Sequence, residues 1–266
     1  MEHYELLEMI KKNPQAIVSV EDPTEEMKRT ALRENGLLLE YIKNPTKELQ
    51  EIALENNPHA IKFIKKPTEA MMIKAIKGGW INLEYIVKPT EYVLRMALGQ
   101  AGWAVKYIKD PSEDLQLIAV RTNYDAIKFI KQPCASAQEE AVRASYDALR
   151  LIKAPTHQAE LIAIQQNEEA ITYINDLDKA KILEYLRVNF LVIKYVKNKI
   201  TREDLEQVIK EVISREEVQD KYIRDFINYN TMDSFGMKPV DKIMMIYEYG
   251  SKRAKRIAVD EKLMMK

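Results

Sequence analysis

Apolar side chains recur along this chain with a fixed spacing of 22 residues. One position holds an aromatic residue or leucine that isoleucine follows directly, and the position ten residues before it holds alanine. The first series is Tyr41, Phe63, Tyr85, Tyr107, Phe129, Leu151 and Tyr173, and the alanine series is Ala31, Ala53, Ala75, Ala97, Ala119, Ala141 and Ala163. Seven of the ten prolines keep the same step, from Pro23 to Pro155. Because this period lies inside the chain, it indicates a repeat protein.

Each repeat predicts two short helices. In the unit that begins at Pro45, Leu49, Ile52 and Ala53 lie three and four residues apart, which is helical spacing. We expect a first helix of about ten residues here, followed by a second of about seven within residues 59–66. The next proline ends the second helix, because the residue before a proline avoids helical backbone angles.

Polar residues at the ends of these helices support the assignment. Thr24, Thr46, Thr68, Thr90, Ser112 and Thr156 follow their prolines, so each is a candidate N-cap. The turn between the two helices holds Asn35, Asn57, Asn123, Asn167 and Asn189 in most repeats. Asparagine tolerates the left-handed conformation that ends many helices, and we expect these residues to adopt it.

The repeat pattern extends over residues 1–198 and gives about nine units, with the clearest ones in the centre. A helix of seven residues is unstable alone in water, so the units must be stabilised by stacking on their neighbours. The recurring alanine would allow close helix approach, and the aromatic residue would fill the gap between units. The sequence therefore predicts an all-α protein, an α-solenoid of helix-turn-helix repeats.

The 22-residue step fails after Asn198, and residues 199–266 form a separate segment. Thr201 and Ser214 each begin a predicted helix, a loop follows at residues 228–236, and one or two more helices end the chain. We interpret this segment as a C-terminal helical cap on the repeats. The alternative is a small effector or dimerisation module, for which the evidence is the basic cluster Lys252, Arg253, Lys255 and Arg256 and the methionine pairs 244–245 and 264–265.

The repeat does not fit the better-known repeat classes. Tetratricopeptide and HEAT units are longer, and no unit shows the alternating leucines of a leucine-rich repeat. The pattern P-T-x-x-x-x-x-x-A-x-x-x-N-x-x-A-I-x-[FY]-I-K resembles a class of short helical repeats of unknown function found in bacteriophage, large-virus and protist proteins. This resemblance covers residues 1–198 and implies no catalytic residue. A viral origin would imply interference with a host defence or regulatory protein.

The amino-acid composition and the apolar runs exclude some classes of function but indicate none. The 266 residues include 41 Lys and Arg against 41 Asp and Glu, so net charge draws the chain toward neither nucleic acid nor membrane. No apolar run approaches the length of a membrane span, and the first residues lack the apolar centre of a signal peptide. We therefore expect a cytoplasmic protein without a membrane partner, in the host cytoplasm if the protein is viral.

Few residues are candidates for chemistry. His3, His59 and His157 lie on different repeats and cannot readily converge on one metal ion. The single cysteine, Cys134, takes the place of the capping threonine, where a small side chain suffices. Gly78 and Gly79 lack the spacing of a phosphate-binding loop. We expect no enzyme activity, no metal and no cofactor.

Cations of the second helices form the first candidate binding surface. They stand at two fixed places in the repeat, three residues apart: Lys62, Lys65, Lys106, Lys109, Lys128, Lys131, Arg150 and Lys153. One interpretation is stabilisation of the helix, since cations in a last turn offset the negative end of its dipole. The other is a basic edge that binds an acidic protein surface or a phosphate backbone.

Aromatic residues near the turn between the two helices of the central repeats form the second candidate binding surface. Trp80, Tyr124 and Tyr146 share one place in the repeat, Trp103 lies one place later, and Arg121 and Arg143 precede the two tyrosines by three residues. They could anchor a partner, since Trp, Tyr and Arg dominate interface hot spots, or pack one turn on the next. Four glycines in the same two repeats as the tryptophans favour the first interpretation.

The predicted function is that of a non-catalytic scaffold whose extended surface binds another macromolecule, with a protein favoured as partner. The alternative is a nucleic-acid-binding repeat protein, in which the lysines track phosphates and the aromatic residues stack on bases. The balanced charge weighs against that alternative. Homo-oligomerisation through the C-terminal segment is also open.

Overall fold

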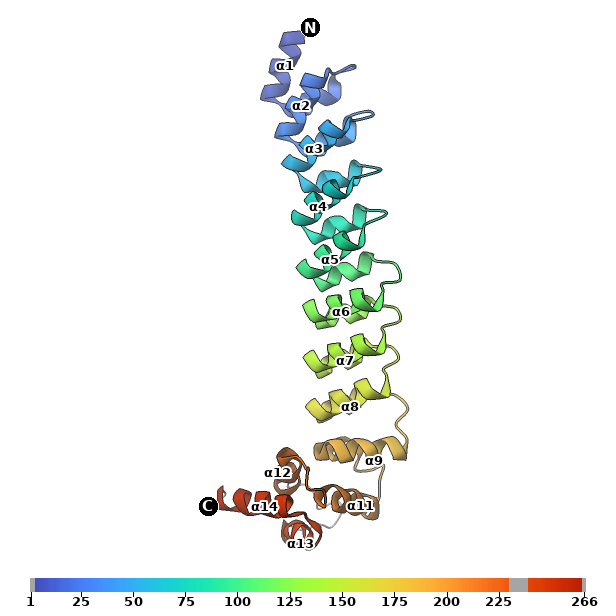
Figure 1. The fold of residues 1–266 in the computed structure, drawn as a ribbon, viewed down its shortest axis with the longest axis vertical. Coiled ribbons are helices and arrows are strands. Elements are labelled where there is room, and N and C mark those ends of the chain that lie inside the picture. The colour runs from blue at the N-terminus through green and yellow to red at the C-terminus, as the bar shows by residue number, and fades with distance from the viewer. Residues whose placement is uncertain (1–2, 230–238, 265–266) are drawn as a thin grey trace. The chain divides into compact units, whose positions relative to one another are not determined.

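The computed structural model describes residues 3–229 and 239–264, and within them all regular structure is helical, with no strand (Figure 1). The chain divides into two compact parts, Met1–Ala137 and Gln138–Lys266. Both contain consecutive packed helical repeats, which confirms the predicted α-solenoid fold class.

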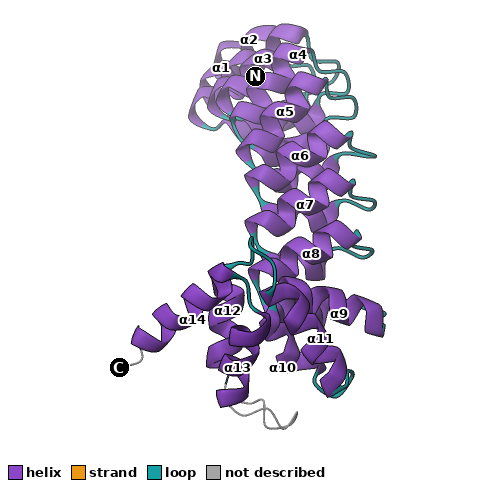
Figure 2. Ribbon diagram, turned by 60° about the horizontal axis from the view of Figure 1, so that its bottom comes forward, coloured by secondary structure: helices purple, strands orange, loops and turns teal. Residues whose placement is uncertain are grey.

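The first part alternates α-helices with six-residue 3₁₀-helices. Its elements are α1 (His3–Lys12), η1 (Pro14–Ser19), α2 (Glu25–Glu34), η2 (Gly36–Tyr41), α3 (Lys47–Asn56), η3 (Pro58–Phe63), α4 (Glu69–Lys77), η4 (Trp80–Tyr85), α5 (Glu91–Gln100), η5 (Gly102–Tyr107), α6 (Glu113–Thr122) and η6 (Tyr124–Phe129). From α2 to α6 each α-helix packs on the next, and from η2 to η6 so does each 3₁₀-helix. The loops between repeats lie along one edge of this stack (Figure 2). The helix α7 (Ala135–Ala144) spans the division between the parts.

The predicted caps of the first helices are confirmed. The side-chain oxygens of Thr24, Thr46, Thr68, Thr90, Ser112 and Thr156 each accept a hydrogen bond from the backbone N–H three residues later. Each cap satisfies a donor that would otherwise stay unpaired at a helix start.

The asparagine turns are built differently from our expectation. Asn35 has a φ of −148°, which is extended and not left-handed backbone. Its side chain instead accepts a hydrogen bond from the N–H of Leu37, and Asn57, Asn167 and Asn189 repeat this bond. Asparagine is therefore used here as the N-cap of the second helix.

The second helices are 3₁₀-helices of six residues in most repeats, not α-turns. In η2 the N–H of Leu38 bonds to the carbonyl of Asn35, and the N–H of Ile42 to that of Leu39, three residues back. A 3₁₀-helix rises about 2.0 Å per residue, so six residues span the same layer as a longer α-helix would.

The core of each repeat consists of the predicted alanine and isoleucine positions. The seven alanines from Ala31 to Ala163 are fully buried, and Ile42, Ile64, Ile86 and Ile130 are nearly so. The aromatic residues before the isoleucines fill the gap between repeats in part: Tyr85, Tyr107 and Tyr173 are half-buried and each contacts a ring of the preceding repeat, whereas Tyr41 and Phe129 are exposed.

The second part continues the repeats and then changes. Its elements are η7 (Tyr146–Leu151), α8 (His157–Gln166), η8 (Glu168–Tyr173), α9 (Lys179–Val188), η9 (Phe190–Val192), α10 (Ile193–Val196), α11 (Arg202–Ile213), α12 (Asp220–Asn228), α13 (Pro239–Tyr249) and α14 (Lys252–Met264). The capping box at Thr201 and Asp204 is present. Ser214 ends α11 instead of starting a helix, because its backbone N–H closes the last turn of that helix.

The predicted domain boundary at 198/199 stays a prediction. The alternation of α-helix and 3₁₀-helix does end near it, and α11 packs on α9 while α12 packs on η9. Asn228 is the last residue of α12, and residues 230–236 of the predicted loop lie outside the described residues, as does Met265 of the second methionine pair. No helix in the described ranges has both the length and the apolar character needed to cross a membrane.

Candidate functional site

A groove of about 630 Å³ opens at the repeat-joining loops of the first part. We call it the basic groove, because its lining carries three cations and one acid, Asp110; the residues used below are Lys106, Tyr107, Lys109, Gln116, Phe129 and Lys131. Lys106 belongs to η5, and Lys109 lies in the loop that follows this 3₁₀-helix; both line the groove. Lys131 occupies the same place as Lys109 in the next repeat, so three cations border one concave surface.

Two aromatic rings line the basic groove, and its three cations differ in their contacts. Phe129 is 39% exposed and offers a ring edge or face, while Tyr107 donates a hydrogen bond to Glu84 at 3.2 Å. The ammonium of Lys106 lies 4.6 Å from the ring centre of Tyr107. Within the described part of the chain, neither Lys109 nor Lys131 has an ion pair or hydrogen bond from its ammonium group. These two cations are therefore available to an anionic group.

The floor of the basic groove is fixed by a buried glutamine. The Nε2 group of Gln116 donates to the carbonyl of Pro111 at 3.0 Å, and its Oε1 accepts from the N–H of Cys134 at 2.8 Å. Gln116 thus joins the loop of its own repeat to the start of the following one. Cys134 itself stands where the other repeats have a capping Thr or Ser, and its thiol lies 3.4 Å from the hydroxyl of Ser136.

The remaining predicted cations separate into two kinds. Lys62 and Lys128 lie over the rings of Phe63 and Phe129, at 4.7 and 5.1 Å from the ring centres. Lys128 also pairs with Asp125 at 2.7 Å, and Arg150 lies 3.9 Å from Asp147. Lys65 and Lys153 are exposed at the place equivalent to Lys109. The cations three residues earlier in the repeat are Lys62, Lys106, Lys128 and Arg150. They largely contact side chains of the protein itself.

The central aromatic residues are mostly engaged with neighbouring repeats. Trp80 packs against Tyr107 of the next repeat, with 6.2 Å between ring centres, and the ammonium of Lys106 lies 5.4 Å from its ring. Trp103 donates its indole N–H to Asp125 at 2.7 Å. Burial raises the pKa of Asp125, but the hydrogen bonds from Lys128 and Trp103 outweigh it and hold this pKa below its usual value.

Tyr124 and Tyr146 differ although they share one place in the repeat. Tyr124 is exposed. Tyr146 stacks on Tyr173 and donates to Glu169 at 3.1 Å, and that hydrogen bond raises the pKa of Tyr146 to about 12. Arg143 pairs with Glu139 at 2.7 Å, and Arg121 is exposed near the end of α6. Most of these residues thus contact neighbouring side chains of the protein, and none of the six lines the basic groove.

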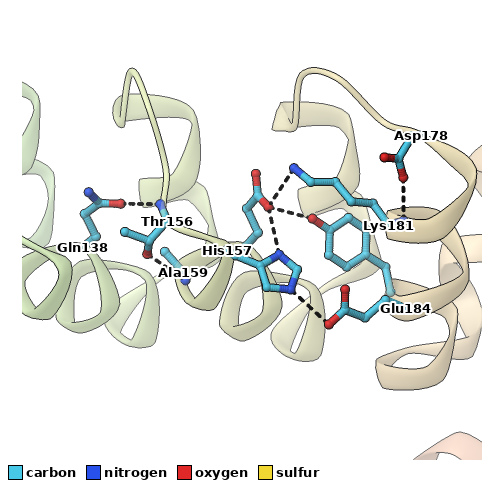
Figure 3. A network of polar contacts seen from close by, with 9 residues as sticks. Gln138, Thr156, His157, Ala159, Asp178, Lys181 and Glu184 are labelled. Carbon is cyan, nitrogen blue, oxygen red and sulfur yellow. Dashed lines mark hydrogen bonds and ion pairs between the residues drawn. The ribbon is translucent and has the colours of Figure 1, made fainter.

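A polar network in the second part was not foreseen. The buried carboxylate of Glu160 accepts from the hydroxyl of Tyr185 at 2.7 Å and lies 3.4 Å from the ammonium of Lys181 (Figure 3). His157 lies between two carboxylates, with Nδ1 3.5 Å from Glu160 and Nε2 3.0 Å from Glu184. The hydrogen bond to Glu184 raises the pKa of His157, burial opposes it, and Glu160 adds to the rise.

This network replaces a glutamine contact. Gln138 accepts from the N–H of Thr156 one repeat earlier, just as Gln116 accepts from Cys134. The third residue of this series is Glu160, and Tyr185 stands where the other repeats have alanine. These two departures from the repeat pattern are the sequence features that could have indicated the polar network. Burial and the bond to Glu160 raise the pKa of Tyr185 and keep it protonated.

The described residues contain no cluster of three or more His, Cys, Asp or Glu side chains that could hold a metal ion. Comparison of the chain with protein-family models, with curated proteins and with solved structures finds no match in any of the three. The resemblance to short viral and protist repeats therefore stays a prediction.

Proposed function

We propose that this protein is a non-catalytic helical repeat scaffold and that the basic groove binds an acidic segment of a partner protein. The observation that carries the proposal is the pair Lys109 and Lys131, whose ammonium groups have no ion pair or hydrogen bond among the described residues and which line one concave surface. Carboxylates satisfy such cations, and Tyr107 and Phe129 add apolar contact area. A host defence or regulatory protein as partner is what the resemblance implies.

Nucleic acid is less well supported than protein. A strand would need a continuous row of free cations, but Lys62, Lys106 and Lys128 lie over aromatic rings. Trp80 and Tyr146 are held against other rings, so their faces are partly covered for base stacking.

The test is calorimetric titration of the full chain with two probes, a short peptide rich in Glu and Phe and a single-stranded oligonucleotide. We expect the peptide to bind the wild type and to lose at least about tenfold in affinity in Lys109→Glu with Lys131→Glu. The control is Lys12→Glu with Lys47→Glu, which reverses two exposed cations outside the groove.

Equal peptide affinity for the two double variants would contradict the proposal. So would binding of the oligonucleotide alone with a steep loss between about 50 and 200 mM salt, which would favour the nucleic-acid alternative.

A further inference from the structure

The helices α13 and α14 enclose a second concave surface, of about 510 Å³. Its apolar residues are Ile243, Ile246, Tyr247, Ala258, Val259 and Leu263. Tyr247, Val259 and Leu263 are 72%, 58% and 65% exposed. Side chains of this size seldom stay so exposed in one continuous patch unless the patch meets a partner.

The described residues that line this groove include two cations and no acid. Lys255, Val259 and Lys262 lie four and three residues apart, so they share one side of α14, and both lysines line the groove. Lys255 lies 5.8 Å from the ring centre of Tyr247. The acid Glu261 is turned away, since it pairs with Arg224 of α12 and accepts from Asn228.

The dimensions of this face fit a helix. The helices α13 and α14 have 11 and 13 residues and so are about 16 to 20 Å long. That length accommodates roughly three turns of a bound helix, whose apolar residues recur at three, four and seven residues.

The charge of the groove favours one of two possible occupants, a second copy of this chain or a helix of a partner protein. A second copy seated on this groove would place two faces against each other that both carry lysines in their lining, and like charges placed together oppose association. Acidic residues beside an apolar stripe would instead pair with both lysines. We infer that the face formed by α13 and α14 binds an amphipathic helix with acidic flanks from a partner protein.

This site is separate from the basic groove and does not depend on it. It differs in chemistry, since the basic groove offers free cations with little apolar area, whereas the α13–α14 face offers an apolar stripe with cations at its borders.

The probe is an 18-residue helical peptide with leucines on one side and glutamates on both borders of that side. Two control peptides carry lysines in place of the glutamates, or the same residues in an order without an apolar side. Titration of the full chain should show binding of the glutamate peptide and binding at least about tenfold weaker for both controls.

Two variants make the assignment specific. Val259→Asp should weaken the glutamate peptide at least about tenfold, while Val87→Asp, at an 86% exposed valine of the first part, should leave it unchanged. Lys255→Glu with Lys262→Glu should reverse the preference toward the lysine peptide. Because Val259 is exposed, loss of folding is not expected, and circular dichroism checks this.

Several results would overturn the inference. They are equal binding of the three peptides, an unchanged affinity in Val259→Asp, a concentration-dependent dimer that Val259→Asp abolishes, and binding to phosphatidylserine vesicles without peptide binding. The Lys109→Glu, Lys131→Glu variant should bind the glutamate peptide normally, so failure of the proposed function and failure of this inference are distinguishable.

Discussion

Two glycines of the first part show how differently one residue type can be used. Gly102 starts η5, and a β-carbon there would come within 2.0 Å of the carbonyl oxygen of Ala119. Gly99 lies inside α5, and a β-carbon there would meet nothing within 4 Å. The glycines near the tryptophans therefore do not mark a binding site as a group, and Gly102 is required for close packing of repeats.

The two positions predict opposite effects of alanine. Gly99→Ala should raise the free energy of unfolding by about 0.5–1 kcal/mol, because glycine is a poor helix former. Gly102→Ala should lower it by about 1–3 kcal/mol, because the backbone of two repeats must move apart. Urea denaturation of both variants measures the difference, and equal midpoints would contradict the packing role of Gly102.

The charge of His157 makes the stability of the second part depend on pH. Its pKa is raised in the folded protein, so its contribution is fully present below the unfolded value of about 6.5 and is lost as the pH rises through the higher folded value. Because the side chain is nearly half exposed, solvent screening keeps the expected gain below about 1 kcal/mol.

The corresponding variant is His157→Gln. The melting temperature should fall below that of the wild type at about pH 5.5, and the gap should narrow above about pH 8. His3→Gln, at an exposed histidine of α1, is the control and should show no such trend. A gap that widens with rising pH would show that the neutral imidazole is the stabilising form.

At the scale of helices, the sequence predicted the first helix of each repeat well and the second only in part. Leu49, Ile52 and Ala53 span enough turns to identify a helical period. Over six residues, periods of 3.0 and 3.6 place the same side chains inward, so Ala60 and Ile61 could not tell a 3₁₀-helix from an α-helix.

The candidate site was predicted residue by residue but not as a surface. Lys106, Lys109 and Lys131 were all identified from their spacing. Whether each ammonium group contacts another side chain depends on the position of the Tyr107 ring and on how closely adjacent loops approach. The spacing of residues along the chain gives no information on either. The α13–α14 face could not be predicted, because residues 199–266 have no repeat to set which sides are buried.

Side-chain hydrogen bonds also join one repeat to the next, and Gln116 tests how much they contribute to stability. Gln116→Ala removes the acceptor of the Cys134 N–H and the donor to Pro111, which should cost about 1–3 kcal/mol. Gln132→Ala, at an exposed glutamine, should change stability by less than about 0.5 kcal/mol. Chemical denaturation compares them, and equal losses would show that the Gln116 bonds contribute little.

At the scale of the whole molecule, stacked repeats make stability a sum of local terms. Within Met1–Ala137 each helix from α2 to α6 contacts mainly its neighbours in chain order. If one whole repeat is deleted, the repeats on either side can still pack α-helix on α-helix and 3₁₀-helix on 3₁₀-helix. If only the α-helix of a repeat is deleted, this pairing is lost.

Deletion of residues 67–88, which removes α4 and η4, should leave the helical signal per residue nearly unchanged in far-UV circular dichroism. Deletion of residues 67–77 removes only the α-helix and should reduce that signal and the cooperativity of unfolding. Equal behaviour of both deletions would show that the 22-residue unit is not the structural module.

The single thiol of the chain has a practical consequence. Cys134 is half-buried at a repeat boundary, and its backbone N–H is bonded to Gln116 beside Lys131. A fluorophore or spin label attached to this sulfur would sit at the border of the basic groove without any engineered residue. Its spectrum would follow occupancy of that groove in real time, and the α13–α14 face could be loaded separately as an internal reference.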